Sequence, residues 1–255
     1  MVRGYDIVGD IAILEISPEL AGKEHAIAQA VLHTHKHVKT VLAKREKHGG
    51  EFRTRPMRFI AGEDKRETLV RESGCSMLID VERVYYSVRL STERLRIAAL
   101  VQPGEEVLVL FSGAGPYVCV IAKHSKAARV VGVEKNPLAH EYALSNVRRN
   151  ALRNADVLEG DAALVSSLAL GRFDRIILMY PSGSLDFVAS ALEVLKDNGV
   201  LHVYAFAREE ELPALQNEVL KRCAHRGCAS VERVVRAGHQ KPYVYRWCLD
   251  VVVGT

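Results

Sequence analysis

The sequence lacks the features that mark a membrane protein or a secreted one. Its apolar runs fall far short of the roughly 20 residues that a membrane-spanning helix needs, and residues 1–10 lack the basic-then-apolar layout of a signal peptide. The five cysteines form an odd, scattered set, which favours a reducing compartment over a disulfide framework. Cys223 and Cys228 also lack the paired spacing of a zinc site. We therefore expect a cytoplasmic protein with no membrane partner and no bound metal.

A strong excess of positive charge is also missing, but its distribution is uneven. The net charge of +4 over 255 residues would not by itself indicate a nucleic-acid-binding protein. Residues 34–58, however, contain eight Lys or Arg against two Glu. Such a basic segment attracts phosphate backbones in a salt-dependent way. The alternative interpretation is an ordinary solvated face.

The front of the chain, residues 1–88, has the pattern of a small α+β domain. Residues 5–16 predict two short strands around a Gly9-Asp10 turn, and the apolar spacing over residues 23–45 predicts a helix. Further strands are expected within residues 50–88. This domain carries the basic segment, so we expect it to position RNA.

The remainder, residues 89–255, alternates between strand and helix patterns. It opens with "STERLRIAALV", which predicts a helix capped by Ser or Thr. Alternation of this kind predicts a mostly parallel sheet with helices on both faces, an α/β fold. The expected strands are 107–111, 129–134, 156–159, 174–180 and 199–205, with helices 116–124, 137–150, 184–196 and 208–222 and two late strands near 230–235 and 243–253.

Three strand ends carry the elements of an adenosine pocket. The stretch "VLVLFSGAGPY" runs from a strand through Gly113 and Gly115 into a helix. Glu134 ends the second strand, where an acid can accept both ribose hydroxyls, and Asp161 follows the third strand, where it can meet an adenine amine. No third glycine follows, so the loop favours S-adenosylmethionine over NAD. Each acid alone is equally typical of a helix cap.

The sequence resembles a known family in order and spacing of motifs along nearly the whole chain. "YDIVGDIAIL", "GGEFRTR", "AGEDKRETLVRESG", "DVERVYYSVRLSTERLRIA", "FSGAGPY", "VEKNP", "DRIILMYP" and "DNGVLHVYAF" are similar to archaeal tRNA (guanine-37, N1)-methyltransferases. Their relatives, the aminocarboxypropyl transferases of wybutosine synthesis, share much of this pattern. The resemblance implies a class I (Rossmann-like) methyltransferase fold, S-adenosylmethionine as donor and the tRNA anticodon stem-loop as partner. We also expect a monomer.

The resemblance also assigns roles to individual residues. Glu93 matches the general base that removes the guanine N1 proton, and Arg53 matches the cation that stabilises charge on O6. The alternatives are a helix cap for Glu93 and a surface cation for Arg53. The positions implied to contact the target base and its phosphates are Arg45, Tyr85, Arg89 and Arg94. Those implied to contact the cofactor are Phe111, Gly113, Gly115, Glu134, Asp161, Met179 and Pro181.

Two departures from the family pattern keep several functions open. Met179-Tyr180-Pro181 replaces an Asn-Leu-Pro signature whose asparagine helps to hold guanine, and Val109 replaces an aspartate before the glycine turn. A methionine offers no amide donor or acceptor. The candidates are therefore methylation of guanine 37 or of a tricyclic derivative, aminocarboxypropyl transfer to the tricyclic base, and tRNA binding without catalysis.

Overall fold

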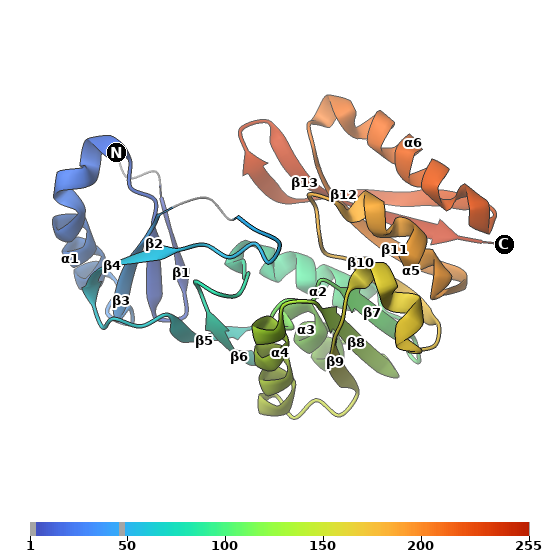
Figure 1. Ribbon diagram of the computed structural model, residues 1–255, viewed down its shortest axis with the longest axis horizontal. Helices are drawn as coiled ribbons and strands as arrows, with labels where there is room; N and C mark the ends of the chain where they lie inside the picture. The colour runs from blue at the N-terminus through green and yellow to red at the C-terminus, as the bar shows by residue number, and fades with distance from the viewer. Residues whose placement is uncertain (1–3, 46–48, 255) are drawn as a thin grey trace. The chain divides into compact units, whose positions relative to one another are not determined.

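The computed structural model describes residues 4–45 and 49–254, which form two compact units, Met1–Val88 and Arg89–Thr255 (Figure 1). Part of the basic segment, Glu46, Lys47 and His48, lies outside the described residues. Among the residues described, no helix is both long enough and apolar enough to cross a membrane.

The first unit contains a four-stranded sheet with the order β1-β2-β3-β4. Its central pair, β2 and β3, is parallel, and the two outer pairs are antiparallel. Helix α1 packs on this sheet through Ala28 and Val31, beside Val41 and Ile60. A separate hairpin of β5 and β6 follows. The bounds are β1 Tyr5–Val8, β2 Ile11–Leu14, α1 Glu24–Thr34, β3 Thr40–Lys44, β4 Met57–Gly62, β5 Glu67–Glu72 and β6 Cys75–Asp80, with a 3-10 turn at Pro18–Lys23.

The helix predicted over residues 23–45 is wrong in its second half. Helix α1 ends at Thr34, and residues 40–44 form strand β3. Strand β3 is an inner strand, and every residue from Thr40 to Ala43 is buried. A strand that is covered on both faces has a continuous apolar run, which periodicity alone cannot distinguish from a buried helix.

The second unit is built on a seven-stranded sheet with the order β12-β13-β11-β10-β7-β8-β9. Strands β7 to β11 are parallel, and β13 runs antiparallel to both of its neighbours, β11 and β12. The strands are β7 Glu106–Leu110, β8 Arg129–Glu134, β9 Ala155–Glu159, β10 Phe173–Leu178, β11 Leu195–Ala207, β12 Ala229–Lys241 and β13 Val244–Val253. The helices are α2 Ser91–Leu100, α3 Pro116–His124, α4 Pro137–Arg149, α5 Val188–Glu193 and α6 Leu212–Cys223. The α/β fold class is confirmed.

The strand order places a switch point between β7 and β10. From β7 the chain proceeds through β8 and β9 toward one end of the sheet, and from β10 it proceeds through β11 toward the other. In open α/β sheets, ligands bind at the carboxyl ends of the strands where the order reverses. The predicted cofactor residues follow these same strands.

Two local predictions in this unit are wrong. The helix expected over 184–196 is a 3-10 turn at Ser184–Phe187 followed by α5, and β11 already begins at Leu195. Leu195 pairs with Phe173 ahead of a register shift, so sheet pairing extends into the apolar run. Helix α2 begins at Ser91 itself, with Leu90 at the N-cap position and no side-chain cap hydrogen bond. The predicted Ser or Thr cap is therefore absent at this described helix.

Candidate cofactor and active site

The glycine loop connects β7 to α3 through a series of left-handed residues. Phe111, Gly113 and Gly115 have φ values of 60°, 57° and 78°. The left-handed φ of Gly115 favours glycine, and a Cβ built there would lie 3.2 Å from the Cβ of Ala143 in α4, a tight contact that Ala143 would have to relieve by a small shift. The tight turn brings the first residues of α3 to the carboxyl edge of the sheet.

Glu134, at the end of β8, supports this loop. Its carboxylate accepts hydrogen bonds from the backbone N–H groups of Gly113, at 2.7 Å, and of Asn136, at 2.8 Å. Burial raises the pKa of Glu134, and these backbone hydrogen bonds only partly oppose the shift. A carboxylate has about four lone-pair sites, so two oxygens that each accept one N–H can still accept the two hydroxyls of a ribose.

Asp161 combines a helix cap with an ion pair. Its carboxylate accepts from the backbone N–H of Ala163 at 2.9 Å, and it lies 2.7 Å from the ammonium group of Lys135. The hydrogen bond from Lys135 is the main cause that lowers the pKa of Asp161. Asp161 therefore does cap the turn that follows it, as one interpretation of the sequence expected, and its contact with an adenine amine stays a prediction.

An aromatic cluster occupies the switch point between β7 and β10. The rings of Phe111 and Tyr180 are stacked with centroids 4.9 Å apart, and Phe187 meets Phe111 edge-on at 4.8 Å. The predicted residues on either side of Tyr180 are fixed through the backbone: the N–H of Met179 donates to Leu110, and the carbonyl of Pro181 accepts from Phe206. Tyr180 was not among the predicted cofactor residues, although it lies between two of them.

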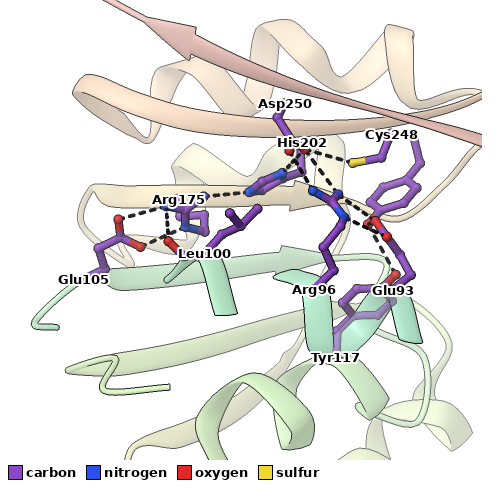
Figure 2. A network of polar contacts seen from close by, with 10 residues as sticks. Glu93, Arg96, Leu100, Glu105, Tyr117, Arg175, His202, Cys248 and Asp250 are labelled. Atoms are coloured by element: carbon purple, nitrogen blue, oxygen red, sulfur yellow. Dashed lines mark hydrogen bonds and ion pairs between the residues drawn. The ribbon is translucent and has the colours of Figure 1, made fainter. Parts of the chain in front are cut away.

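Glu93 is buried at the start of α2 and is held by two other side chains (Figure 2). Arg96, one turn along the helix, donates from Nε at 2.8 Å and from a terminal nitrogen at 2.7 Å, one bond to each carboxylate oxygen. The hydroxyl of Tyr204 in β11 donates to Oε1. Burial raises the pKa of Tyr204, so this hydroxyl stays a neutral donor.

The network continues beyond Arg96 along one face of the sheet, as Figure 2 shows. Arg96 also donates to Asp250 in β13, at 2.7 Å, and Asp250 accepts from Nδ1 of His202 at 2.6 Å. Nε2 of His202 lies 2.8 Å from Arg175. Arg175 in turn forms two hydrogen bonds with Glu105.

The contacts of His202 define its protonation state. A guanidinium group only donates hydrogen bonds, so Nε2 must accept from Arg175 and the proton resides on Nδ1, facing Asp250. Burial lowers the pKa of His202 despite the neighbouring Asp250. Burial alone would raise the pKa of Asp250, but hydrogen bonds from His202 and Arg96 hold it below its usual value.

His202, Cys248 and Asp250 also present ligand-type atoms within 4.8 Å of one another. Two guanidinium groups already contact this cluster, because Arg96 bonds Asp250 and Arg175 bonds His202. Their charges disfavour a metal ion at the same atoms. We interpret the cluster as a hydrogen-bonded network that joins α2 to strands β11 and β13 of the sheet.

The strand register places Glu93 at the carboxyl edge, close to the glycine loop. Leu110, Leu178 and Val203 are paired across β7, β10 and β11, so Tyr204 lies one residue beyond this level, as Phe111 and Met179 do. The hydroxyl of Tyr204 is also 3.4 Å from that of Tyr117, which follows the glycine loop directly. Glu93 is therefore linked through Tyr204 to the helix that the loop begins.

The remaining predicted residues are distributed over the two units. In the first unit, Arg53 has a left-handed φ of 52° and its guanidinium lies 5.7 Å from the ring centre of Tyr85, so two of the predicted RNA-contacting residues meet. Arg45 is exposed there. In the second unit, Arg89 is exposed, whereas Arg94 is buried with its guanidinium over the ring of Tyr117.

Ion pairs neutralise part of the positive charge of the basic segment. Lys44 and Arg58 form ion pairs with Glu15 and Glu24, which compensate two of its cations. Arg55 is half-buried, and its Nε has no hydrogen-bond partner in the described part of the chain. Burial lowers the pKa of Arg55. Sequence reasoning did not single out Arg55, because only the fold shows that it is desolvated.

The sheet order and the glycine loop define a class I (Rossmann-like) methyltransferase. Residues 68–232 match the TRM5/TYW2 methyltransferase domain, and residues 1–65 match the TYW2 N-terminal domain. The chain belongs to the TRM5/TYW2 methyltransferase family.

Named relatives lie on both branches of this family. The chain is 37% identical over 250 residues to tRNA (guanine(37)-N(1))-methyltransferase Trm5b of Pyrococcus abyssi, covering 96% of this chain and 73% of the relative. It is 32% identical to the tRNA(Phe) (4-demethylwyosine(37)-C(7)) aminocarboxypropyltransferase of Methanocaldococcus jannaschii, covering 81% and 79%. A crystal structure of Trm5b from Pyrococcus abyssi superposes with a TM-score of 0.89 at 34% identity, covering 99% of this chain and 76% of that one.

Proposed function

We propose that the chain is a tRNA methyltransferase that transfers a methyl group from S-adenosylmethionine to N1 of guanine 37, or of a tricyclic derivative at that position, in the anticodon loop. The observation that carries this proposal is the position of Glu93, a buried carboxylate next to the helix that the glycine loop begins. The name of the Trm5b relative supports the same reaction and target. We further propose a cytoplasmic monomer whose first unit positions the RNA.

The hydrogen-bonding groups at the carboxyl edge of the sheet fit S-adenosylmethionine. Glu134 would accept from the ribose hydroxyls while it holds Gly113, and Asp161 would accept from the adenine amine. Gly113 and Gly115 allow the backbone to approach the amino-acid end of the cofactor. The cluster that includes Phe111, with Met179 and Pro181 beside it, would border the cofactor and the target base.

The chain's own residues would supply the proton transfer. When bound, S-adenosylmethionine provides a methyl carbon activated by a sulfonium sulfur. Glu93 would accept the N1 proton as the bond from N1 to carbon forms and the bond from carbon to sulfur breaks. Arg53 would stabilise the negative charge that develops on O6. Arg45, Tyr85 and Arg89 would contact the base and its flanking phosphates, whereas Arg94 is buried against Tyr117 and would act only by supporting the start of α3.

The Met179-Tyr180-Pro181 segment favours a second candidate, aminocarboxypropyl transfer to the tricyclic base. Methionine removes the amide that holds guanine in the family pattern, and Tyr180 offers a stacked aromatic surface beside it. A bulkier, tricyclic base suits such a surface. The aminocarboxypropyltransferase relative is consistent with this alternative.

One experiment separates the candidates. The protein is incubated with S-adenosylmethionine and with anticodon stem-loop RNAs that carry either guanine or the tricyclic base at position 37, and the nucleosides are analysed by mass spectrometry. We expect a gain of one methyl group. A gain of the whole aminocarboxypropyl arm would establish the second candidate, and tRNA binding without any transfer would leave only a binding function.

A further inference from the structure

The turn side of the β12–β13 hairpin is rich in positive charge. Residues 233–249, flanked by Glu232 and Asp250, contain four Lys or Arg and no Asp or Glu, together with Tyr243, Tyr245 and Trp247. The exposed members include Arg233, Arg236 and Lys241. None of these three cations belongs to an ion pair within the part of the chain that the structure describes. Basic residues interleaved with aromatic ones are typical of nucleic-acid-binding surfaces.

The turn of this hairpin lies at the same sheet edge as the candidate site. Ala207, the last residue of β11, pairs with Tyr245, and Lys241 pairs with Val244 in the hairpin, so the turn projects past the carboxyl end of β11. The hairpin forms one end of the sheet, shown in orange and red in Figure 1. Because β11 is parallel to β7 and β8, the turn and the glycine loop belong to the same edge.

The turn presents an aromatic ring to solvent. Tyr243 is 76% exposed at the turn and has a left-handed φ of 63°. Tyr245, two residues after Tyr243, has the guanidinium of Arg236 over its ring, 3.4 Å from the ring centre. An exposed ring can stack on an unpaired base, and neighbouring cations can contact the adjacent phosphates.

The outer strand is poorly suited to pairing with a second copy of the chain. Strand β12 has register shifts at Val231/Arg233, Arg236/Gly238 and His239/Lys241. Bulges and charged residues on an edge strand oppose edge-to-edge association. The charge of the hairpin therefore favours a polyanion over another protein strand.

We propose that the β12–β13 hairpin is an RNA-contact surface on the catalytic unit, in which Tyr243 stacks on an unpaired base of the tRNA anticodon loop. Lys241, beside the turn, contacts the adjacent phosphate, and Arg233, which pairs with Asp250 farther along β12, contacts a more distant one. This inference rests on the proposed function, since it takes the anticodon loop as the substrate. It adds a second contact surface to the basic segment of the first unit.

The test compares tRNA affinities of surface variants. Tyr243→Ala should weaken tRNA binding about 5- to 150-fold, the range expected for loss of one stacked base, while Tyr243→Phe retains wild-type affinity. The Arg233→Ala/Lys241→Ala pair should also make the plot of log K against log salt shallower by up to about 1.4, because each phosphate contact to single-stranded RNA contributes about 0.7.

A matched control removes cations from the opposite edge. Arg148 and Arg149 lie exposed in the last turn of α4, which returns from the carboxyl edge, and their double alanine variant should bind tRNA as the wild type does. All variants should bind S-adenosylhomocysteine equally, which confirms folding.

If the wild type modifies tRNA but Tyr243→Ala and the cation pair bind it normally, the hairpin proposal is wrong while the proposed function stands. If Tyr243→Ala loses affinity but no group is transferred by the wild type, the hairpin proposal holds and the methyltransferase proposal fails. A change of oligomeric state on gel filtration, with tRNA binding unaltered, would instead identify a protein contact.

Discussion

Glu93 illustrates how the meaning of one residue depends on its neighbours. Both of its oxygens are hydrogen-bonded to Arg96, and one also accepts from Tyr204. These contacts fix the carboxylate in one orientation and supply the charge that a buried carboxylate needs. These contacts are made to other side chains and do not cap the helix, since no side-chain cap hydrogen bond is present at the N-terminus of α2.

Glu93→Gln should lower the single-turnover rate of methyl transfer by about 10²- to 10⁴-fold, since glutamine retains the size of the side chain but not its basicity. Rapid-quench measurements at saturating cofactor and tRNA check this. Affinities for tRNA and S-adenosylhomocysteine serve as controls and should change little. A variant that keeps the full rate would show that the N1 proton goes elsewhere.

His202 should make the stability of the protein depend on pH. Its pKa is lowered in the folded state, so below about pH 6.5 the unfolded chain binds a proton that the folded chain does not, and stability falls as pH falls. The loss at about pH 5.5 amounts to at most about 1.4 kcal/mol. His202→Gln, which can still accept from Arg175 and donate to Asp250, should remove this part of the loss.

Urea unfolding at about pH 7.5 and about pH 5.5 measures the difference for both proteins. The wild type should lose more free energy of unfolding between the two values than His202→Gln does. Equal losses would mean that His202 is already protonated in the folded protein, with Nε2 turned away from Arg175.

At the scale of elements, the glycine loop is the connection on which the candidate cofactor site depends. It begins at the end of β7, and it is held from β8 by Glu134 and packed from α4 by Ala143. Three elements, β7, β8 and α4, therefore determine one turn. A change that distorts the turn should affect both stability and cofactor binding.

Gly115→Ala tests this connection, with Gly104→Ala as the matched control. Both glycines have left-handed φ values, 78° and 87°, so both variants should lose about 1–2 kcal/mol from backbone strain. Only Gly115 has a neighbour in the path of a new Cβ, because nothing lies within 4 Å at Gly104. Calorimetric titration with S-adenosylhomocysteine should show weaker binding for Gly115→Ala alone. Similar affinities of the two variants for S-adenosylhomocysteine would show that the glycine loop does not contact the cofactor.

At the scale of the whole molecule, charge is concentrated in separate places on a chain of small net charge. The basic segment in the first unit retains exposed Lys39 and Arg45, while Lys44 and Arg58 are compensated by acids. Local concentrations of this kind, rather than the net charge of +4, determine where a polyanion binds.

Lys39→Glu/Arg45→Glu should weaken tRNA binding and make its salt dependence shallower by about 1.4, the value expected for two lost phosphate contacts. Filter binding over a series of salt concentrations measures both quantities. Cofactor affinity should be unaltered, and the Arg148→Glu/Arg149→Glu variant controls for the change of net charge. An unchanged salt slope would favour the solvated-face interpretation of residues 34–58.

The sequence by itself determined the fold class and the glycine loop. Strand and helix periods, the Gly113 and Gly115 turn and the acids at strand ends are properties of neighbouring residues, so they can be read locally. Strand β8 and helix α3 begin and end where they were predicted. The helices predicted over 23–45 and 184–196 were each too long, because the apolar residues at their ends pair into the sheets as parts of β3 and β11.

Only the tertiary structure decided what surrounds Glu93. Tyr204 and Asp250 are 111 and 154 residues away from their partners Glu93 and Arg96, and they meet because β11 and β13 are adjacent in the sheet. No local pattern encodes such a pairing, since it depends on strand order and register. The same order places the basic turn around Tyr243 at the carboxyl edge. Local chemistry thus specified the cofactor loop, and the long-range pairing of strands specified its surroundings.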